Sequence, residues 1–209
     1  MQNCILCQSY KTSLYYQDHN RMFLNCNTCD CVFIPHKDLP KPEEEKTRYL
    51  AHQNDVEDRG FQKFVAPMVQ AILANHSTKD MGLDFGAGTG PVVSKLLGDL
   101  NYKTALYDPF FHPNKAALKD TYEFIVCCEV IAHLHNPLKE FVLLKKLLKK
   151  KGILYCMTDL LPEKEGFKNW YYKNDFTHVI FYTPKTLQWI QKKVGFKHLE
   201  IDRRLIKFY

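Results

Sequence analysis

A glycine-rich turn, Gly86-Ala87-Gly88-Thr89-Gly90, constrains the fold of this chain more than any other stretch. The apolar residues 81–85 stand before it and Pro91 follows it, which is the order of a strand, a tight turn and a helix that begins at proline. Glycine permits a positive φ and lets the backbone approach a ligand closely. The sequence therefore predicts a small-molecule site at this turn, although a turn without a ligand has the same local pattern.

Strand-like and helix-like segments alternate on the carboxyl side of the turn. The expected strands cover residues 103–107, 124–130, 152–158 and 179–182, with further strands within 197–209. The expected helices cover residues 91–97, 137–150 and 184–194. This alternation predicts an α/β fold with a doubly wound, mainly parallel sheet. Ligands of such sheets bind at the carboxyl ends of the strands.

Two helices are expected ahead of the sheet. Residues 43–50 begin with three glutamates, which suit the first turn of a helix, and apolar residues recur at helical spacing through 61–73. The three prolines within residues 35–42 disfavour a helix in that segment. We therefore expect a small N-terminal unit at 1–36, a linker at 37–42, leading helices at 43–80 and the main domain at 81–209.

Four cysteines of the N-terminal unit have the spacing of a metal site. Cys4 and Cys7 form one C-x2-C pair, and Cys26 and Cys29 form another. Thiolates from two such pairs can close a tetrahedral zinc site. A hairpin formed from the apolar segments between the pairs would complete a structural zinc ribbon. Another metal, no metal and a redox role are the alternatives.

The other cysteines are interpreted differently. Cys31 offers a fifth thiol, which is either a packing residue or an alternative ligand. Cys127, Cys128 and Cys156 stand in apolar, strand-like segments and are interpreted as small buried hydrophobes. A basic-then-apolar leader is missing from the N-terminus, so that the paired spacing favours metal over disulfides and predicts a cytoplasmic protein.

An acid, Asp108, follows the second expected strand. Its two carboxylate oxygens can accept both hydroxyl groups of a ribose. The dinucleotide-binding pattern G-x-G-x-x-G fails, because Pro91 stands where the third glycine belongs. A phosphate-binding lysine does not accompany the glycines either, so the expected ligand need not carry a phosphate.

Three motifs together resemble the class I S-adenosylmethionine-dependent methyltransferases, over residues 43–209. They are the stretch 83–90, Asp108 and the segment 128–134. The resemblance implies a seven-stranded sheet with a reversed last strand, and a glycine turn beneath the methionine part of the cofactor. The segment that holds adenine in this family is shortened here to residues 119–122. The implied cofactor-binding residues are Asp84, Gly86, Ala87, Gly88, Gly90, Asp108 on the ribose, Pro109, Cys128 and Glu129.

Two further stretches, 48–55 and 170–179, resemble a bacterial subgroup of these enzymes that carries the same ribbon. A ribbon ahead of such a domain is also similar to sugar C-methyltransferases and to some ribosomal RNA guanine methyltransferases. These resemblances imply a fold and a cofactor, and they leave the methyl acceptor open.

Methyl transfer to a hydroxyl group needs a base, and three histidines are candidates. His178 is the first choice because it stands in the polar loop after the fifth strand, where this architecture places substrate contacts. His133, just past the fourth strand, is the second, and His52 with Tyr49 on the leading helix is the third. Each histidine has a purely structural alternative. The aromatic residues 170–172 either wall an apolar pocket or fill the core.

We therefore expect methyl transfer from S-adenosylmethionine to a small hydroxylated or sugar-like metabolite. The first alternative is an RNA methyltransferase whose ribbon binds RNA, which a net charge of +6 permits. The lysines of 145–151 are interpreted as the solvated face and end of a helix, or as an RNA-facing patch. The second alternative is a non-catalytic S-adenosylmethionine-binding scaffold. Apolar runs are too short for a membrane span, and the oligomeric state stays open.

Overall fold

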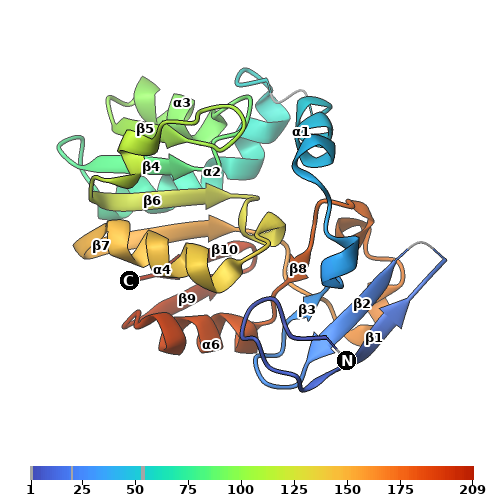
Figure 1. The fold of residues 1–209 in the computed structure, drawn as a ribbon. Helices are drawn as coiled ribbons and strands as arrows, with labels where there is room; N and C mark the ends of the chain where they lie inside the picture. The colour runs from blue at the N-terminus through green and yellow to red at the C-terminus, as the bar shows by residue number, and fades with distance from the viewer. Residues whose placement is uncertain (1, 20, 53–54) are drawn as a thin grey trace.

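A six-stranded sheet forms the centre of the molecule, in the order β5-β4-β6-β7-β10-β9 (Figure 1). The computed structural model describes residues 2–19, 21–52 and 55–209, so that residues 53 and 54 of the stretch 48–55 lie outside the described part. The strands are β4 (Met81–Phe85), β5 (Lys103–Tyr107), β6 (Tyr122–Cys128), β7 (Leu148–Met157), β9 (Leu199–Asp202) and β10 (Leu205–Phe208). The first four in spatial order are parallel, and β10 is antiparallel to both neighbours. The α/β fold and the reversed strand are confirmed.

The expectation of seven strands is wrong. The expected strand at 179–182 pairs in a different sheet, and the segment 108–121 between β5 and β6, to which the sequence assigned no strand, contains a β-bridge between Asp108 and His112 and the 3-10 helix η2 (Lys115–Leu118). A parallel strand with its own crossover helix needs a longer segment. The sheet therefore ends at β5, directly beside the glycine turn.

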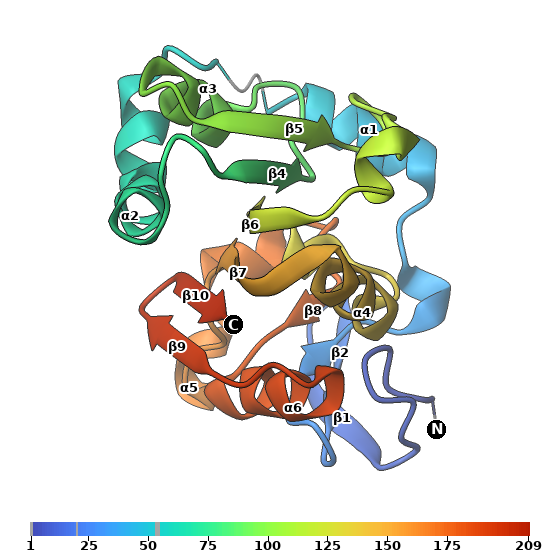
Figure 2. The same cartoon turned by 90° about the vertical axis from the view of Figure 1, so that its left-hand side faces the viewer.

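Helices cover both faces of the sheet (Figure 2). The residues of β6 alternate, with Phe124 and Val126 packing into one hydrophobic cluster and Ile125 and Cys127 into another. The first cluster includes side chains of α2 (Arg59–Asn75) and α3 (Val92–Asp99), and the second includes α4 (Pro137–Leu147) and α6 (Pro184–Val194). Burial on both faces explains the uninterrupted apolar sequence of β6.

Helix α4 is shorter than expected, because β7 begins at Leu148. The lysines at 149–151 therefore stand at the exposed start of a strand instead of the end of a helix. Lys149 Nζ lies 2.6 Å from Glu123 Oε1 of β6, the neighbouring strand. The interpretation of these three lysines as part of a helix is wrong.

A second sheet brings the N-terminus onto the main domain. The expected hairpin is formed by β1 (Thr12–Gln17) and β2 (Met22–Cys26), and β3 (Val32–Phe33) pairs with β2. The fourth strand, β8 (Ile180–Phe181), comes from the far end of the chain and pairs with β3 (Figure 1). One hydrophobic cluster contains buried side chains from both sheets, so that the N-terminal sheet shares its core with the main domain.

Short helices connect these parts. They are η1 (His36–Asp38), α1 (Pro42–Leu50), η3 (Ile131–His133), α5 (Lys164–Phe167) and η4 (Tyr171–Asn174). Helix α1 begins at Pro42, which was expected in the linker, and has three glutamates in its first turn, as the sequence predicts. Among the described residues, no helix combines the length and apolar character that crossing a membrane requires.

Candidate active site and metal centre

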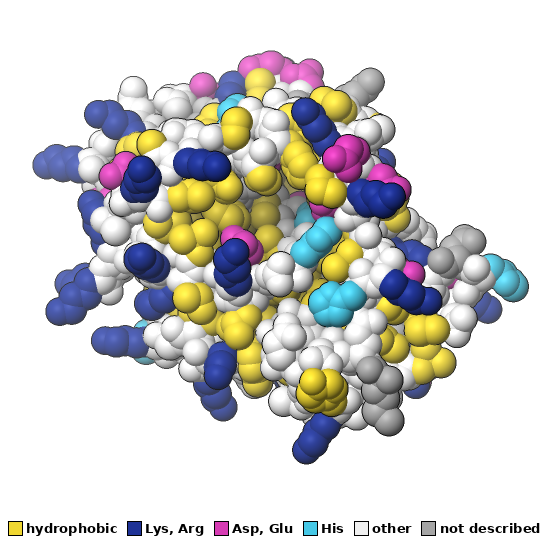
Figure 3. All heavy atoms as spheres, viewed as in Figure 1, with side chains coloured by type: hydrophobic (Ala, Val, Ile, Leu, Met, Phe, Trp, Pro, Cys, Tyr) yellow, Lys and Arg dark blue, Asp and Glu magenta, His cyan; other side chains and the backbone are white. Residues whose placement is uncertain are grey.

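A cavity of about 1160 Å³ opens at the carboxyl ends of β4, β5 and β6. Its walls are the glycine turn, helix α1, the segment after β6 and the loop 171–178. The space-filling view shows histidine side chains beside a hollowed, largely apolar region (Figure 3). This is the edge at which parallel α/β sheets bind ligands.

The glycine turn needs its glycines at two positions. Gly86 and Gly88 have φ values of 78° and 62°, which disfavour other residues. A Cβ on Gly86 would stand 2.5 Å from a methyl carbon of Val130, so the turn packs closely against the segment after β6. Gly86 N and Ala87 N both donate to Tyr107 O, at 2.8 and 3.2 Å. The turn is thereby held against the end of β5.

The two acids at this edge have different surroundings. Asp84 is buried and accepts a hydrogen bond from Ser94 Oγ at 2.7 Å. Burial raises the pKa of Asp84 to about 6. Asp108 Oδ2 accepts from Gly88 N at 3.0 Å, and Oδ1 accepts from the backbone N–H groups of Phe110 and Phe111 at 2.8 and 3.0 Å. Asp108 therefore joins the glycine turn to the loop that begins at Pro109, which also lines the cavity.

The end of β6 contributes a charged cluster. Glu129 has a φ of 54°, and its side chain accepts from Tyr172 Oη at 2.7 Å and from Arg204 Nη2 at 3.0 Å. Burial raises the pKa of Glu129. Burial also raises the pKa of the neighbouring Cys128 thiol well above its usual range, which disfavours a thiolate nucleophile there. Arg204 stands in the turn between β9 and β10, and no sequence pattern pointed to it.

The four candidate catalytic residues gather at one side of the cavity. The rings of His133 and His178 have centroids 4.6 Å apart, and the Tyr49 ring lies 5.3 Å from that of His133. The His52 ring lies 6.3 Å from that of Tyr49. Tyr49 comes from α1, His133 from η3 and His178 from the loop before β8, so the fold brings together three segments that are distant in sequence. His52 was expected on the leading helix but lies in the turn directly after α1.

The hydrogen bonds of His133 and His178 fix their tautomers. His133 Nδ1 lies 3.0 Å from Thr177 O, and His178 Nδ1 lies 2.6 Å from Tyr172 O. A carbonyl oxygen only accepts, so each Nδ1 carries the proton and each Nε2 of the neutral ring has a free lone pair. Burial lowers the pKa of His178 to about 4 and that of His133, with a contribution from His178, to about 3. Both rings are therefore neutral at physiological pH.

Other residues of this wall were missed by sequence reasoning. Asp175 Oδ2 accepts from Arg48 Nε and Nη2 at 3.0 and 2.8 Å and lies 3.6 Å from His52 Nε2. These bonds hold the pKa of Asp175 well below its usual range, against the opposing effect of burial. Glu45, also buried, accepts from Tyr49 Oη at 3.3 Å. Both Arg48 and Asp175 fall in the stretches that resemble the bacterial subgroup, but nothing in the sequence indicates their pairing.

Arg21, from the turn between β1 and β2, holds the loop that carries His178. Its Nη1 donates to Lys173 O and Asp175 O at 2.7 and 2.9 Å. Its Nη2 donates to His178 O at 2.7 Å and to Phe176 O at 3.4 Å. One guanidinium from the N-terminal sheet thus binds four carbonyl groups of the cavity wall.

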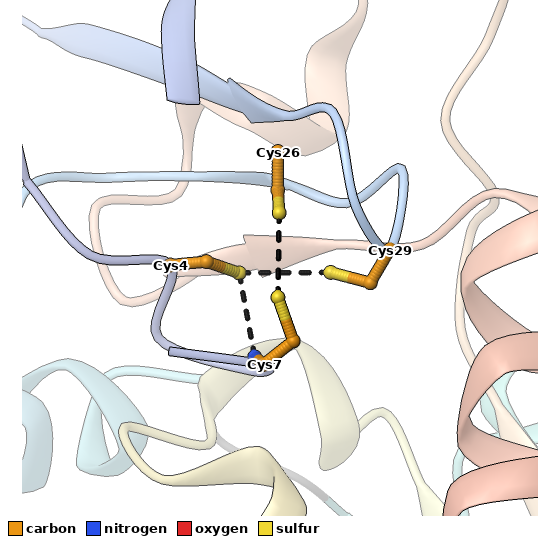
Figure 4. Close-up of side chains that lie close together, drawn as sticks. All are labelled: Cys4, Cys7, Cys26 and Cys29. Atoms are coloured by element: carbon orange, nitrogen blue, oxygen red, sulfur yellow. Dashed lines mark hydrogen bonds between the residues drawn. The ribbon is translucent and has the colours of Figure 1, made fainter. Parts of the chain in front are cut away.

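The four cysteines with paired spacing come together as a candidate metal centre (Figure 4). Their Sγ atoms all lie within 4.8 Å of one another, with 3.6 Å between Cys4 and Cys29 and 3.4 Å between Cys7 and Cys26. Sulfur atoms around a tetrahedral zinc ion, with bonds of about 2.3 Å, are separated by about 3.8 Å. Cys31 is fully buried, and its Sγ lies 3.5 Å from that of Cys4.

Solved structures of methyltransferases share the fold of this chain. An O-methyltransferase family protein from Burkholderia thailandensis has a TM-score of 0.55 at 10% identity, with 83% of this chain and 64% of that chain covered. A SAM-dependent methyltransferase from Archaeoglobus fulgidus has a TM-score of 0.53 at 16% identity, with 66% and 71% covered. Human N-acetylserotonin methyltransferase, solved with SAM, has a TM-score of 0.53 at 11% identity, with 80% and 56% covered.

These likenesses concern the fold, since all three identities are low. The chain spans little more than half the length of the human enzyme and of several other solved methyltransferases that share its fold. No curated protein matches the sequence at a significant level. Residues 57–201, which are more than half of the chain, match the family model described as a methyltransferase domain. The protein therefore belongs to the methyltransferase-domain family and has the Rossmann-like fold of the S-adenosylmethionine-dependent methyltransferases.

Proposed function

We propose that this protein transfers a methyl group from S-adenosylmethionine to a hydroxyl group of a small molecule. The observation that carries the proposal is a single cavity with two chemically different walls. The glycine turn and Asp108 form one wall, and the cluster of His52, His133 and His178 forms another. A nucleoside cofactor at the first wall and an acceptor at the second would lie side by side.

The residues at the first wall fit the cofactor. A ligand pocket has a typical volume of about 300–1,000 Å³, so the cavity of about 1160 Å³ has room for the cofactor and a second small molecule. Oδ1 of Asp108 already accepts two backbone N–H groups, whereas Oδ2 accepts one, so Oδ2 has a second lone pair available for a ribose hydroxyl. Gly86, Gly88 and Gly90 would lie beneath the methionine part, where side chains would fill the space.

Asp84, Ala87, Pro109, Cys128 and Glu129 also line the cavity and remain proposed cofactor contacts. The carboxylate of Asp84 already binds Ser94, so its part would be to support the glycine turn from beneath.

His178 is the proposed base. S-adenosylmethionine, when bound, would supply an electrophilic methyl group, and the electron pair of the broken S–CH3 bond would stay on sulfur as the O–CH3 bond forms. The hydroxyl proton of the acceptor moves to Nε2 of His178, whose Nδ1–H stays on Tyr172 O. His133, His52 and Tyr49 would orient the acceptor within the same wall.

Labelled methyl donor, supplied with fractionated small molecules and fractionated RNA, tests this function. We expect label in a small-molecule fraction and its loss in the His178→Asn variant, which retains a donor near the position of Nδ1. Label in RNA would favour the RNA methyltransferase instead. Binding of the donor without label in any fraction would favour a non-catalytic scaffold.

We further propose a structural zinc ion on Cys4, Cys7, Cys26 and Cys29. A closed set of four thiolates is the donor set of structural zinc sites and leaves no open position for catalysis. We expect one zinc per chain by elemental analysis, retained in Cys31→Ser and lost in Cys26→Ser. A fully folded protein without metal would contradict the proposal.

A further inference from the structure

The charged groups around the cavity favour an uncharged acceptor. Six carboxylates and two guanidinium groups line it: Glu45, Asp84, Asp108, Glu129, Glu140, Asp175, Arg48 and Arg204. Each arginine is already paired, Arg48 with Asp175 at 2.8 Å and Arg204 with Glu129 at 3.0 Å. Within the described ranges, no lysine lines the cavity. A phosphate or carboxylate on the acceptor would therefore meet carboxylates without a free cation to compensate them.

Two ring nitrogens in the histidine wall of the cavity, Nε2 of His133 and Nε2 of His178, have lone pairs that can accept hydrogen bonds. His133 and His178 both line the cavity, and each uses Nδ1 for a backbone carbonyl. In the part of the chain that the structure describes, neither His133 Nε2 nor His178 Nε2 has a hydrogen-bond partner. Neither atom is fully buried. With ring centroids 4.6 Å apart, the two rings can contact one small molecule together.

Aromatic rings complete this wall. Tyr49 lies edge-on to His133 and its ring centroid is 5.9 Å from that of Phe110. Tyr49 Oη donates to Glu45, so the proton of this hydroxyl is already engaged and its oxygen can act as an acceptor. The wall therefore combines apolar faces with hydrogen-bond acceptors, which suits a ring that carries donors.

We infer that the methyl acceptor is an uncharged cyclic molecule with hydroxyl groups on two neighbouring atoms, one bound by His133 Nε2 and the other by His178 Nε2. The inference rests on the proposed function and narrows its substrate class. The hydroxyl on His178 loses its proton and receives the methyl group, while the hydroxyl on His133 keeps its proton and fixes the orientation. The ring is either aromatic, as in a catechol, or saturated, as in a sugar.

Matched acceptors test the inference with the full chain and labelled methyl donor. Catechol and cis-1,2-cyclohexanediol represent the two ring types, phenol and cyclohexanol lack one hydroxyl, and 3,4-dihydroxybenzoate adds a negative charge. We expect kcat/KM for one of the two diols to exceed that of its monohydroxyl partner about tenfold, the effect of one hydrogen bond. Catechol should exceed 3,4-dihydroxybenzoate by a similar factor.

The variant His133→Asn keeps a donor for Thr177 O and removes the Nε2 lone pair. We expect it to lower kcat/KM for the diol about tenfold more than for the monohydroxyl compound. A control variant, His198→Asn, alters an exposed histidine outside the cavity lining and should leave this ratio unchanged. Equal losses on both acceptors would overturn the role of His133.

The outcomes separate this inference from the proposed function. A preference for the charged or the monohydroxyl compounds overturns the inference. It is also overturned if neither diol is methylated and calorimetry detects no binding of either diol to the protein with S-adenosylhomocysteine bound. Failure to bind S-adenosylmethionine, or label confined to RNA, overturns the proposed function itself.

Discussion

Asp108 connects two walls of the cavity through three backbone donors. It accepts from Gly88 on one side and from Phe110 and Phe111 on the other. The same carboxylate is the proposed partner of the cofactor ribose, so it has both a structural and a binding role. Variants at this residue should therefore change cofactor affinity more than a surface acid would.

Replacing Asp108 with Asn should weaken S-adenosylmethionine binding by about tenfold or more, since a hydrogen bond to a charged group contributes about 1.5–3 kcal/mol. Isothermal titration calorimetry measures the affinity directly. Asp120→Asn, which changes an exposed acid, is the matched control and should bind normally. Unchanged affinity in Asp108→Asn would show that the ribose assignment is wrong.

The buried histidines should make the protein sensitive to acid. The pKa of His178 is about 4 in the fold against 6.5 for the free side chain, because burial disfavours the charged ring. Between these values the unfolded chain binds a proton that the folded chain does not, so stability falls as pH drops from about 6.5 toward 4. The loss from His178 alone is on the order of 3 kcal/mol.

Thermal unfolding of the wild type and of His178→Asn across this pH range checks the prediction. The variant should have a flatter dependence, because it lacks the titrating ring. Asp84 and Glu129, with raised pKa values, act in the opposite direction and are common to both proteins. Parallel curves for the two proteins would contradict the assignment to His178.

At the level of elements, the N-terminal sheet supports the loop between η4 and β8. Arg21 binds one carbonyl group of η4 and three of this loop, and β8 completes the sheet itself. Burial lowers the pKa of Arg21, while Asp175 and Asp18 oppose the shift. The guanidinium therefore fixes the backbone from which His178 and Asp175 extend.

Arg21→Gln should lower kcat/KM for the acceptor by about tenfold or more, because it removes several charged hydrogen bonds from the loop. Zinc content and cofactor affinity should stay unchanged. Lys11→Gln, which changes an exposed cation directly before β1, is the control. If added guanidinium ions restore the activity of Arg21→Ala, the effect comes from the position of the loop and not from a general loss of stability. A variant that is less stable but has unchanged kinetics would contradict the positioning role of Arg21.

Local patterns predicted most of the main sheet. The glycine turn, the apolar run of β6 and the proline and glycine at the two ends of α6 all mark boundaries through backbone chemistry, and these elements form as expected. Sequence patterns did not predict which strands pair when the partners are distant in the chain. A strand at 179–182 was predicted and forms over 180–181, but its pairing with β3 depends on a contact between distant segments.

The candidate site was predictable in the same uneven way. Asp108 and the glycines stand at strand ends, where sequence periodicity locates them. Arg21 and Arg204 stand in turns of otherwise ordinary sequence, and their contacts exist only once the sheets assemble. The lysines at 149–151 were misplaced because helical and strand patterns are both compatible with a short charged run.

The molecule as a whole should unfold in one step. Buried side chains of the N-terminal sheet and of the main domain belong to one hydrophobic cluster, and backbone hydrogen bonds join Ile34 to Val179 and Val179 to Ala132. Loss of either part exposes the core of the other. We therefore expect zinc release and loss of cofactor binding at the same temperature.

Calorimetry with a zinc-sensitive dye and a cofactor-binding readout, recorded on one sample, measures the three processes together. Coincident midpoints are expected for the wild type. Two separate transitions, or a folded fragment of residues 37–209 that binds S-adenosylmethionine, would contradict this prediction.

The pairing of β3 with β8 also sets the order of events on the ribosome. Val32 is made early, whereas its partner Phe181 emerges only after the strands β4 to β7 have been synthesised. The first sheet can gather its cysteines early, yet its edge at β3 stays open until residues 180 and 181 of β8 have been synthesised. The nascent chain therefore presents an unpaired strand edge until β8 is made, and a stall before residue 180 would leave that edge exposed.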